Sequence, residues 1–298
     1  MGLIRLQDFS PVTLADKGRI QPLLLANDVC FCDYSFPNLF MWGEIFKTRW
    51  LIEDERLWLY NGYDDLMLLP VGKAIGLPEL VVVSDSLRSE GKKGDFVLVD
   101  RDFVTETPGL ERFFSVEIDP DNGDYIYSSQ KLIDLKGNKL HKKRNLINQF
   151  LELYPKYACQ PLRADDLGAC LELAEKWCRQ RTCLELDFDH ETSALKKALT
   201  HFSELELNGL KICLGHEMIA FSIFSRLNSN MADVHFEKFV PEIKGIGQVI
   251  NWETAKTLAG EFKYINREQD LGLEGLRQAK RSYDPEYIVS AYFLERKK

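Results

Sequence analysis

The stretch that decides the fold runs from Val234 to Ala259 and reads "VHFEKFVPEIKGIGQVINWETAKTLA". Its first residues alternate between apolar and polar side chains, which is typical of a β-strand with one face toward a core. A turn with Gly245 and Gly247 follows, and a helical pattern then continues to the end of the stretch. The order of strand, turn and helix predicts a βα unit of an α/β domain.

The flanking sequence extends this unit in both directions. Residues 210–239 predict three antiparallel strands joined by short turns. Residues 262–267 predict a strand, 272–283 a helix and 286–294 a last strand. Residues 124–145 and 263–283 also share the pattern Tyr-Ile-x-x-x-Gln, followed in each by a glycine and a basic cluster. Together with a shared order of helix, strands, helix, strand and helix, this faint repeat predicts two related α/β domains, residues 1–157 and 158–298. We expect the active site in the second domain.

Composition restricts the class of protein. The chain has 298 residues, of which 45% are hydrophobic, and a net charge of −8, so it does not resemble a general nucleic-acid binder. The seven cysteines include no C-x-x-C pair, which argues against a disulfide scaffold or a structural zinc site. Cys30 and Cys32 are therefore expected to be buried or half-buried thiols. We expect no metal, and we expect a cytoplasmic protein because neither a signal peptide nor a membrane-spanning stretch is visible.

The stretch 234–259, followed by "YINREQDLGLEGLRQAKRSYDP" (264–285), resembles the C-terminal domain of bacterial phosphatidylglycerol lysyltransferases. "SFPNLFMWGE" and "YIYSSQKLIDLKGNKLHKKRNLINQF" are similar to the same family. The resemblance implies tandem acetyltransferase-like (GNAT-like) domains, each a mixed, mainly antiparallel sheet flanked by helices. It also implies acyl or aminoacyl transfer to an amine or hydroxyl, from aminoacyl-tRNA or acyl-coenzyme A to a small molecule or lipid head group. The oligomeric state stays open.

The candidate catalytic residues come from the predicted strand 232–239 and from the end of the chain. Simple alternation places Asp233, His235 and Glu237 on one face of the strand. Transfer to an amine needs a base, for which Glu237 or His235 is suitable. The resemblance implies that Tyr283 is the general acid. The alternative for the strand is a solvated polar face.

The glycine turn is a candidate binding site. Lys244, Gly245 and Gly247 precede or begin a helix, where free backbone N–H groups and the helix dipole favour anions. The pattern is similar to the coenzyme A loop of acetyltransferases, but Glu242 stands where that loop has Gln or Arg. This carboxylate argues against coenzyme A. The alternative is a turn whose glycines only allow close packing.

A second group of candidate binding residues follows strand 262–267. Asn266, Arg267 and Asp270 lie just beyond its carboxyl end, where open α/β sheets place ligands. Arg277 and Lys280 fall on one face of the next helix. These residues predict the rim of a substrate site. The alternative is that Asp270 caps the helix and the basic face is solvated.

A basic cluster occupies the region 139–144. Lys139, Lys142, Lys143 and Arg144 could bind a tRNA backbone or an anionic lipid head group. A solvated helix face is the alternative. Three functions therefore remain open: an aminoacyltransferase, a coenzyme A-dependent N-acetyltransferase, and a non-catalytic module that binds tRNA or another anion.

Overall fold

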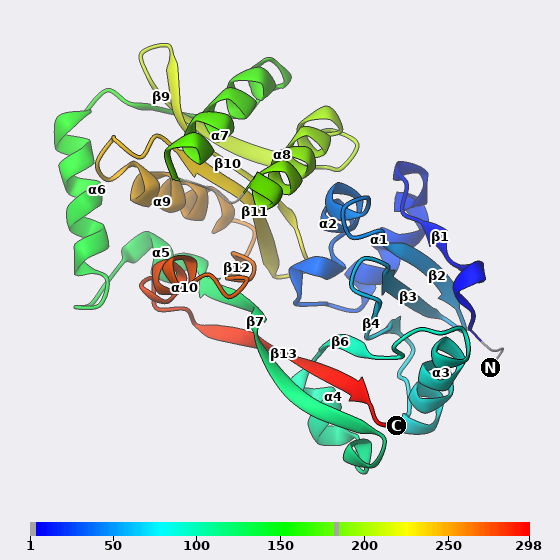
Figure 1. Cartoon of the computed structure of the whole chain (residues 1–298). Helices are drawn as coiled ribbons and strands as arrows, with labels where there is room; N and C mark the ends of the chain where they lie inside the picture. Colours follow the sequence, from blue (N-terminus) through cyan, green and yellow to red (C-terminus); the bar gives the residue numbers. More distant parts are fainter. Residues whose placement is uncertain (1–3, 182–184) are drawn as a thin grey trace. The chain divides into compact units, whose positions relative to one another are not determined.

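The computed structural model describes residues 4–181 and 185–298 and contains the expected fold class (Figure 1). A mixed, mainly antiparallel β-sheet is flanked by helices. The chain divides into two compact units. Unit 1 comprises the residues up to Asp124 with Gln269–Leu273 and Ile288–Lys298, and unit 2 comprises Tyr125–Glu268 with Glu274–Tyr287. The predicted pair of tandem domains divided at 157/158 stays a prediction.

Unit 1 is built around a sheet with the strand order β1, β2, β3, β4, β6, β13. Its strands are β1 (Ser10–Pro11), β2 (Arg49–Glu53), β3 (Arg56–Asn61), β4 (Leu66–Leu68), β5 (Val71–Gly72), β6 (Phe96–Val99) and β13 (Tyr287–Arg296). Its helices are α1 (Lys17–Ala26), α2 (Phe36–Trp42), α3 (Leu77–Ser89) and α4 (Arg101–Glu106), with short 3₁₀ turns at Leu6–Asp8, Leu14–Asp16, Cys32–Tyr34 and Leu110–Arg112. Trp58, Phe96 and Leu80 form part of its core, in which α3 packs on the sheet.

Unit 2 has the strand order β7, β12, β11, β10, β9, β8, where β7 (Phe114–Ser128) enters it from unit 1. The other strands are β8 (Ala158–Pro161), β9 (Asn208–Leu214), β10 (Glu217–Arg226), β11 (Met231–Phe239) and β12 (Tyr264–Asn266). The helices are α5 (Ser129–Asp134), α6 (His141–Leu153), α7 (Leu167–Arg181), α8 (Glu185–Thr200), α9 (Ile246–Leu258) and α10 (Glu274–Arg281), and a 3₁₀ turn spans Ala164–Asp166. β9, β10 and β11 are the predicted antiparallel strands.

The predicted βα unit is the crossover of unit 2. β11 and β12 are parallel neighbours, and α9 connects them, as parallel strands require a crossover. Neighbouring residues of β11 show that helices cover both faces of the sheet. Lys238 binds Glu191 of α8 at 2.8 Å, whereas Phe239 lies against Gly247 of α9. The α8 side and the α9 side are therefore opposite faces of β11 (Figure 1).

Candidate active site

Strand β11 contains a β-bulge at His235. Phe236 is the register partner of Ile223 on β10, and Val234 is the partner of the next residue, Phe224. His235 is consequently an extra residue with no partner of its own on β10. Bulges of this kind redirect side chains and are frequent beside active sites.

The bulge separates residues that the sequence pattern had placed together. Asp233 pairs with Ser225, and Glu237 pairs with Ser222, three positions away on β10. Because strand residues three apart point to opposite faces, Asp233 and Glu237 do so too. The expectation that Asp233, His235 and Glu237 share one face is therefore wrong for Glu237. The extra residue in the bulge interrupts the alternation of side chains and turns Glu237 to the opposite face.

Glu237 belongs to a cluster on the α9 side, centred on Arg267. Arg267 Nη2 donates to Glu237 Oε1 at 2.9 Å, and the exposed fractions of the two side chains are 15% and 12%. With its amide turned toward the guanidinium, Asn251 of α9 accepts from Arg267 Nη1 and Nε at 3.0 and 3.3 Å. Burial alone would lower the pKa of Arg267, but Glu237 and the tyrosines Tyr127 and Tyr283 raise it. The guanidinium is thus held in its charged form.

The two carboxylate oxygens of Glu237 differ in their hydrogen bonding. Oε2 is buried and has no hydrogen-bond partner among residues 4–181 and 185–298. A buried acceptor without a partner is rare and is often associated with a functional site. Arg267 thus fixes Oε1, whereas Oε2 is left without a hydrogen bond from the described part of the chain.

Tyr283 lies in the same cluster. Its ring is 5.3 Å from the Arg267 guanidinium carbon and 4.2 Å from Lys143 Nζ of α6. Burial, assisted by Glu237, raises the pKa of Tyr283, although Arg267 and a hydrogen bond with Gln248 oppose the shift. Burial and Arg267 lower the pKa of Lys143. Tyr283 is therefore a neutral phenol at physiological pH and has cations beside it.

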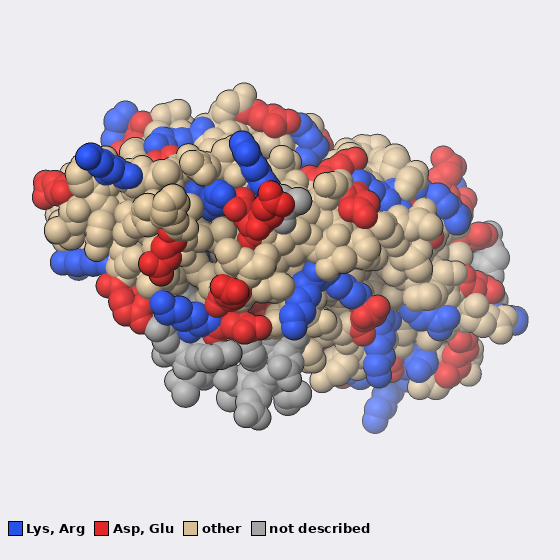
Figure 2. Space-filling view, turned by 90° about the horizontal axis from the view of Figure 1, so that it is seen from above, with Lys and Arg blue, Asp and Glu red and all other residues tan. Residues whose placement is uncertain are grey.

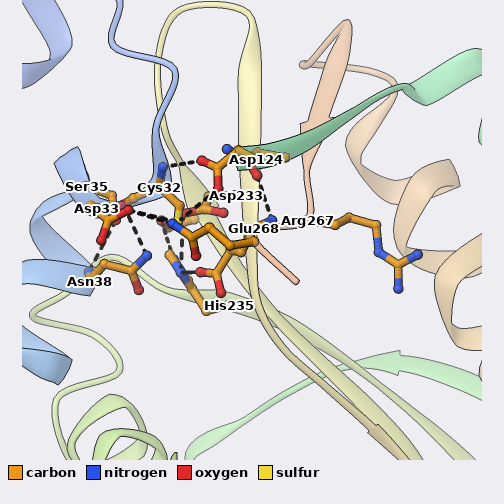
Figure 3. A network of polar contacts seen from close by, with 12 residues as sticks. Cys32, Asp33, Ser35, Asn38, Asp124, Asp233, His235, Arg267 and Glu268 are labelled. Carbon is orange, nitrogen blue, oxygen red and sulfur yellow. Dashed lines mark hydrogen bonds and ion pairs between the residues drawn. The ribbon is translucent and has the colours of Figure 1, made fainter. Parts of the chain in front are cut away.

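A second cluster lies on the other face of β11. His235 Nε2 is 2.8 Å from the Ser225 hydroxyl, and His235 Nδ1 is 3.3 Å from Glu268 Oε1 and 3.5 Å from Asp233 Oδ2. Figure 3 shows Glu268 directed toward His235, while the adjacent Arg267 extends away from it. Two of the predicted catalytic residues, Glu237 and Tyr283, are thus brought together, and His235 is placed in a separate cluster.

The segment after β12 is held by its own polar contacts. The buried Asn266 accepts the Glu268 N–H at 2.6 Å, and Lys280 Nζ donates to the carbonyls of Arg267 and Glu268. Arg277 is half-buried on α10. In unit 1, the buried Asp270 accepts the Gly272 N–H at 3.0 Å.

The glycine turn is closely packed. A Cβ at Gly245, where φ is +86°, would lie 2.4 Å from the Leu146 carbonyl oxygen, and one at Gly247 would lie 2.8 Å from the Phe239 ring. Both glycines are therefore needed for packing of α9, whether or not a ligand binds there. Lys244 is exposed beside them.

The basic residues of 139–144 have separate local contacts. Lys139 pairs with Asp284 at 2.8 Å, Lys143 stacks on Tyr283, and Arg144 binds the Leu135 and Gly137 carbonyls. Lys142 is exposed. Figure 2 shows basic and acidic side chains mixed over the displayed face.

Unit 1 holds a polar cluster around Cys32. The buried Asp124 accepts the Cys32 N–H at 2.6 Å (Figure 3). Gln269 donates to Asp33 at 2.6 Å. Cys32 is buried and Cys30 half-buried, as expected. Burial and nearby carboxylates, Asp28 first among them, raise the pKa of Cys30, which keeps its thiol protonated.

Three residues of the Arg267 cluster were not predicted from the sequence: Tyr127, Gln248 and Asn251. Gln248 and Asn251 are three apart on α9, so they share a helix face, and a polar pair on an apolar helix was the available signal. Tyr127 lies on β7, 140 positions before Arg267, and no local pattern connects the two.

Comparison with known proteins identifies the family. Residues 31–295 match the family described as phosphatidylglycerol lysyltransferase, C-terminal. The chain belongs to this family. A crystal structure of a conserved protein of unknown function from Bacteroides thetaiotaomicron is 32% identical, with 97% of this chain and 99% of that chain covered and a TM-score of 0.90.

Two solved structures with lower sequence identity share the fold. The C-terminal domain of a provisionally assigned lysylphosphatidylglycerol synthetase from Agrobacterium fabrum is 12% identical over 96% of this chain and 93% of that chain, with a TM-score of 0.68. FemX is 9% identical over 97% of both chains, with a TM-score of 0.61. An uncharacterized protein of Mycoplasmoides gallisepticum is 25% identical over 58% of this chain and 56% of its own length. The chain thus matches little more than half of that curated relative.

Among the residues that the structure describes, no helix is both long and apolar enough to cross a bilayer.

Proposed function

We propose that this protein transfers an acyl group, in the first place an aminoacyl group from charged tRNA, to an amine or hydroxyl acceptor. The observation that carries the proposal is the family match over residues 31–295. The Arg267 cluster supports it, because it combines an available carboxylate oxygen with a neutral phenol in a shielded environment. The acceptor class includes a lipid head group, as the family description suggests.

In the proposed reaction, Glu237 is the base. Oε2 takes the proton of the acceptor amine or hydroxyl while the acceptor attacks the carbonyl carbon of the donor. Arg267 holds Oε1 at 2.9 Å, so that the carboxylate cannot turn away. Glu237 is preferred to His235 because it shares a cluster with Tyr283.

Tyr283 is the proposed acid. As the bond between the carbonyl carbon and the donor oxygen breaks, the phenol gives its proton to the leaving ribose oxygen. Lys143 and Arg267 lie beside the ring and stabilise the negative charge that the phenol oxygen acquires. Exchange with solvent then restores the starting protonation of both groups.

Coenzyme A is the less favoured donor, although Gly245 and Gly247 match its loop pattern. Packing accounts for Gly245 and Gly247, and Glu242 is exposed at the start of this turn, where a pyrophosphate would meet its negative charge.

The test is a transfer assay with radiolabelled aminoacyl groups on tRNA. Phosphatidylglycerol vesicles and small amines serve as acceptors, and acetyl-coenzyme A is tried as an alternative donor. We expect label in one acceptor class, and a rate loss of roughly 10²-fold or more in Glu237→Gln and Tyr283→Phe. Glu217→Gln, an exposed carboxylate at the start of β10, is the matched control. Absence of transfer from every donor to every acceptor would refute the function.

A further inference from the structure

The buried residue of helix α10 is a lysine. Neighbouring residues Ala279 and Arg281 are exposed, whereas Lys280 is 9% exposed. A buried ammonium is unfavourable unless polar groups compensate for the lost hydration. Burying a lysine at this position therefore costs free energy, and we expect its polar contacts to compensate for that cost.

The ammonium of Lys280 holds two consecutive carbonyls. Nζ donates to the Arg267 oxygen at 2.6 Å and to the Glu268 oxygen at 2.9 Å. Both oxygens can point to one donor because Glu268 adopts a left-handed backbone with φ of +57°, which is disfavoured for a residue with a side chain. Lys280 thus stabilises an unfavourable backbone conformation.

This backbone conformation decides where two side chains go. Arg267 is directed to Glu237. Glu268 is directed to His235, on the opposite face of β11 (Figure 3). Removing the two hydrogen bonds from Lys280 would destabilise this backbone conformation. The Arg267 guanidinium would then be held less firmly beside Glu237.

The carbonyl of Lys280 is also occupied. It accepts from the Tyr127 hydroxyl at 2.8 Å and from the Tyr283 N–H at 3.1 Å. A single residue therefore connects the backbone that carries Arg267 with the backbone that carries Tyr283. Arg267 and Tyr283 are the neighbours of Glu237 in the cluster.

We propose that Lys280 is a positioning residue: its ammonium sets Arg267, and its carbonyl sets Tyr283, relative to Glu237. The inference rests on the proposed function and deepens it. The sequence suggested instead that Lys280 binds substrate. In the proposed role the ammonium donates to carbonyls of the protein itself and not to the substrate. Removing the ammonium should therefore slow the reaction without weakening substrate binding.

The kinetic test compares Lys280→Met with Arg281→Met in the transfer assay. Methionine keeps most of the apolar stem and removes the donors, and Arg281 is an exposed cation on the same helix. We expect kcat of Lys280→Met to fall by about 10²-fold, as small misplacements of reacting groups can cause, with the donor KM changed by less than about threefold. Wild-type kcat, or a raised KM with unchanged kcat, would overturn the proposal.

A rescue experiment separates positioning from a general loss of structure. Lys280→Ala leaves space for a small amine, so propylammonium should restore part of kcat in a saturable way. Tetramethylammonium at the same concentration cannot donate a hydrogen bond and should restore none. Equal effects of the two cations would overturn the proposal.

Hydrogen exchange distinguishes failure of this inference from failure of the proposed function. In Lys280→Met, but not in Arg281→Met, amide exchange should accelerate in peptides covering 264–286. Transfer by the wild type with unaltered exchange in Lys280→Met would refute the positioning role alone. Accelerated exchange in a protein that transfers nothing would refute the proposed function and leave the structural role of Lys280 standing.

Discussion

At the scale of single residues, burial determines the protonation state of Tyr283, the proposed general acid. The phenol is 6% exposed, and its neighbours are two cations, a carboxylate and an amide. Burial is the largest cause of its raised pKa, so the phenol keeps its proton at physiological pH, as the proposed role of general acid requires.

The same shift predicts a pH dependence of stability. Tyr283 has its raised pKa in the folded state and a value of about 10 in the unfolded state. Its contribution to the free energy of unfolding is therefore fully present below about pH 10 and is lost as the pH rises further. Denaturant unfolding from pH 8 to 11 should show a steeper alkaline loss in the wild type than in Tyr283→Phe.

The control for this prediction is Tyr63→Phe, which removes the hydroxyl of an exposed tyrosine. It should keep the alkaline slope of the wild type. Parallel curves for wild type and Tyr283→Phe would contradict the account of Tyr283.

At the scale of elements, most of unit 2 could be predicted because its local signals agree. Alternation, glycine turns and helical spacing predicted β9, β10, β11, α9, β12 and α10 in their correct order. The bulge at His235 could not be predicted, because polar residues at 233, 235 and 237 imitate an unbroken strand. Only the register with β10 reveals that Glu237 has changed face.

Helix α9 supplies a prediction at this scale. Gly245→Ala should destabilise the protein by about 1–3 kcal/mol, because the left-handed conformation is strained and the new Cβ meets the Leu146 carbonyl. Gly275→Ala in α10, where a Cβ meets nothing within 4 Å, should stabilise by about 0.5–1 kcal/mol. Urea unfolding measures both. Equal effects at the two positions would show that packing does not explain Gly245.

At the scale of the whole molecule, the fold was predictable from a long stretch with recognisable motifs. The Arg267 cluster was predictable only in part. Glu237, Arg267 and Tyr283 stand in the motifs themselves. Tyr127, Lys143 and Asn251 reach the cluster from β7, α6 and α9, and their meeting depends on the topology of the sheet rather than on any local spacing.

The most direct test of the central claim is single-turnover transfer of a labelled aminoacyl group from tRNA by wild type, Glu237→Gln and Tyr283→Phe. Each variant should lose roughly 10²–10⁴-fold in rate, as expected for removal of a positioned base or acid, while its affinity for the charged tRNA changes by less than about threefold. Wild-type rates in both variants, or an equal loss in Glu217→Gln, would contradict the assignment of the Arg267 cluster as the active site.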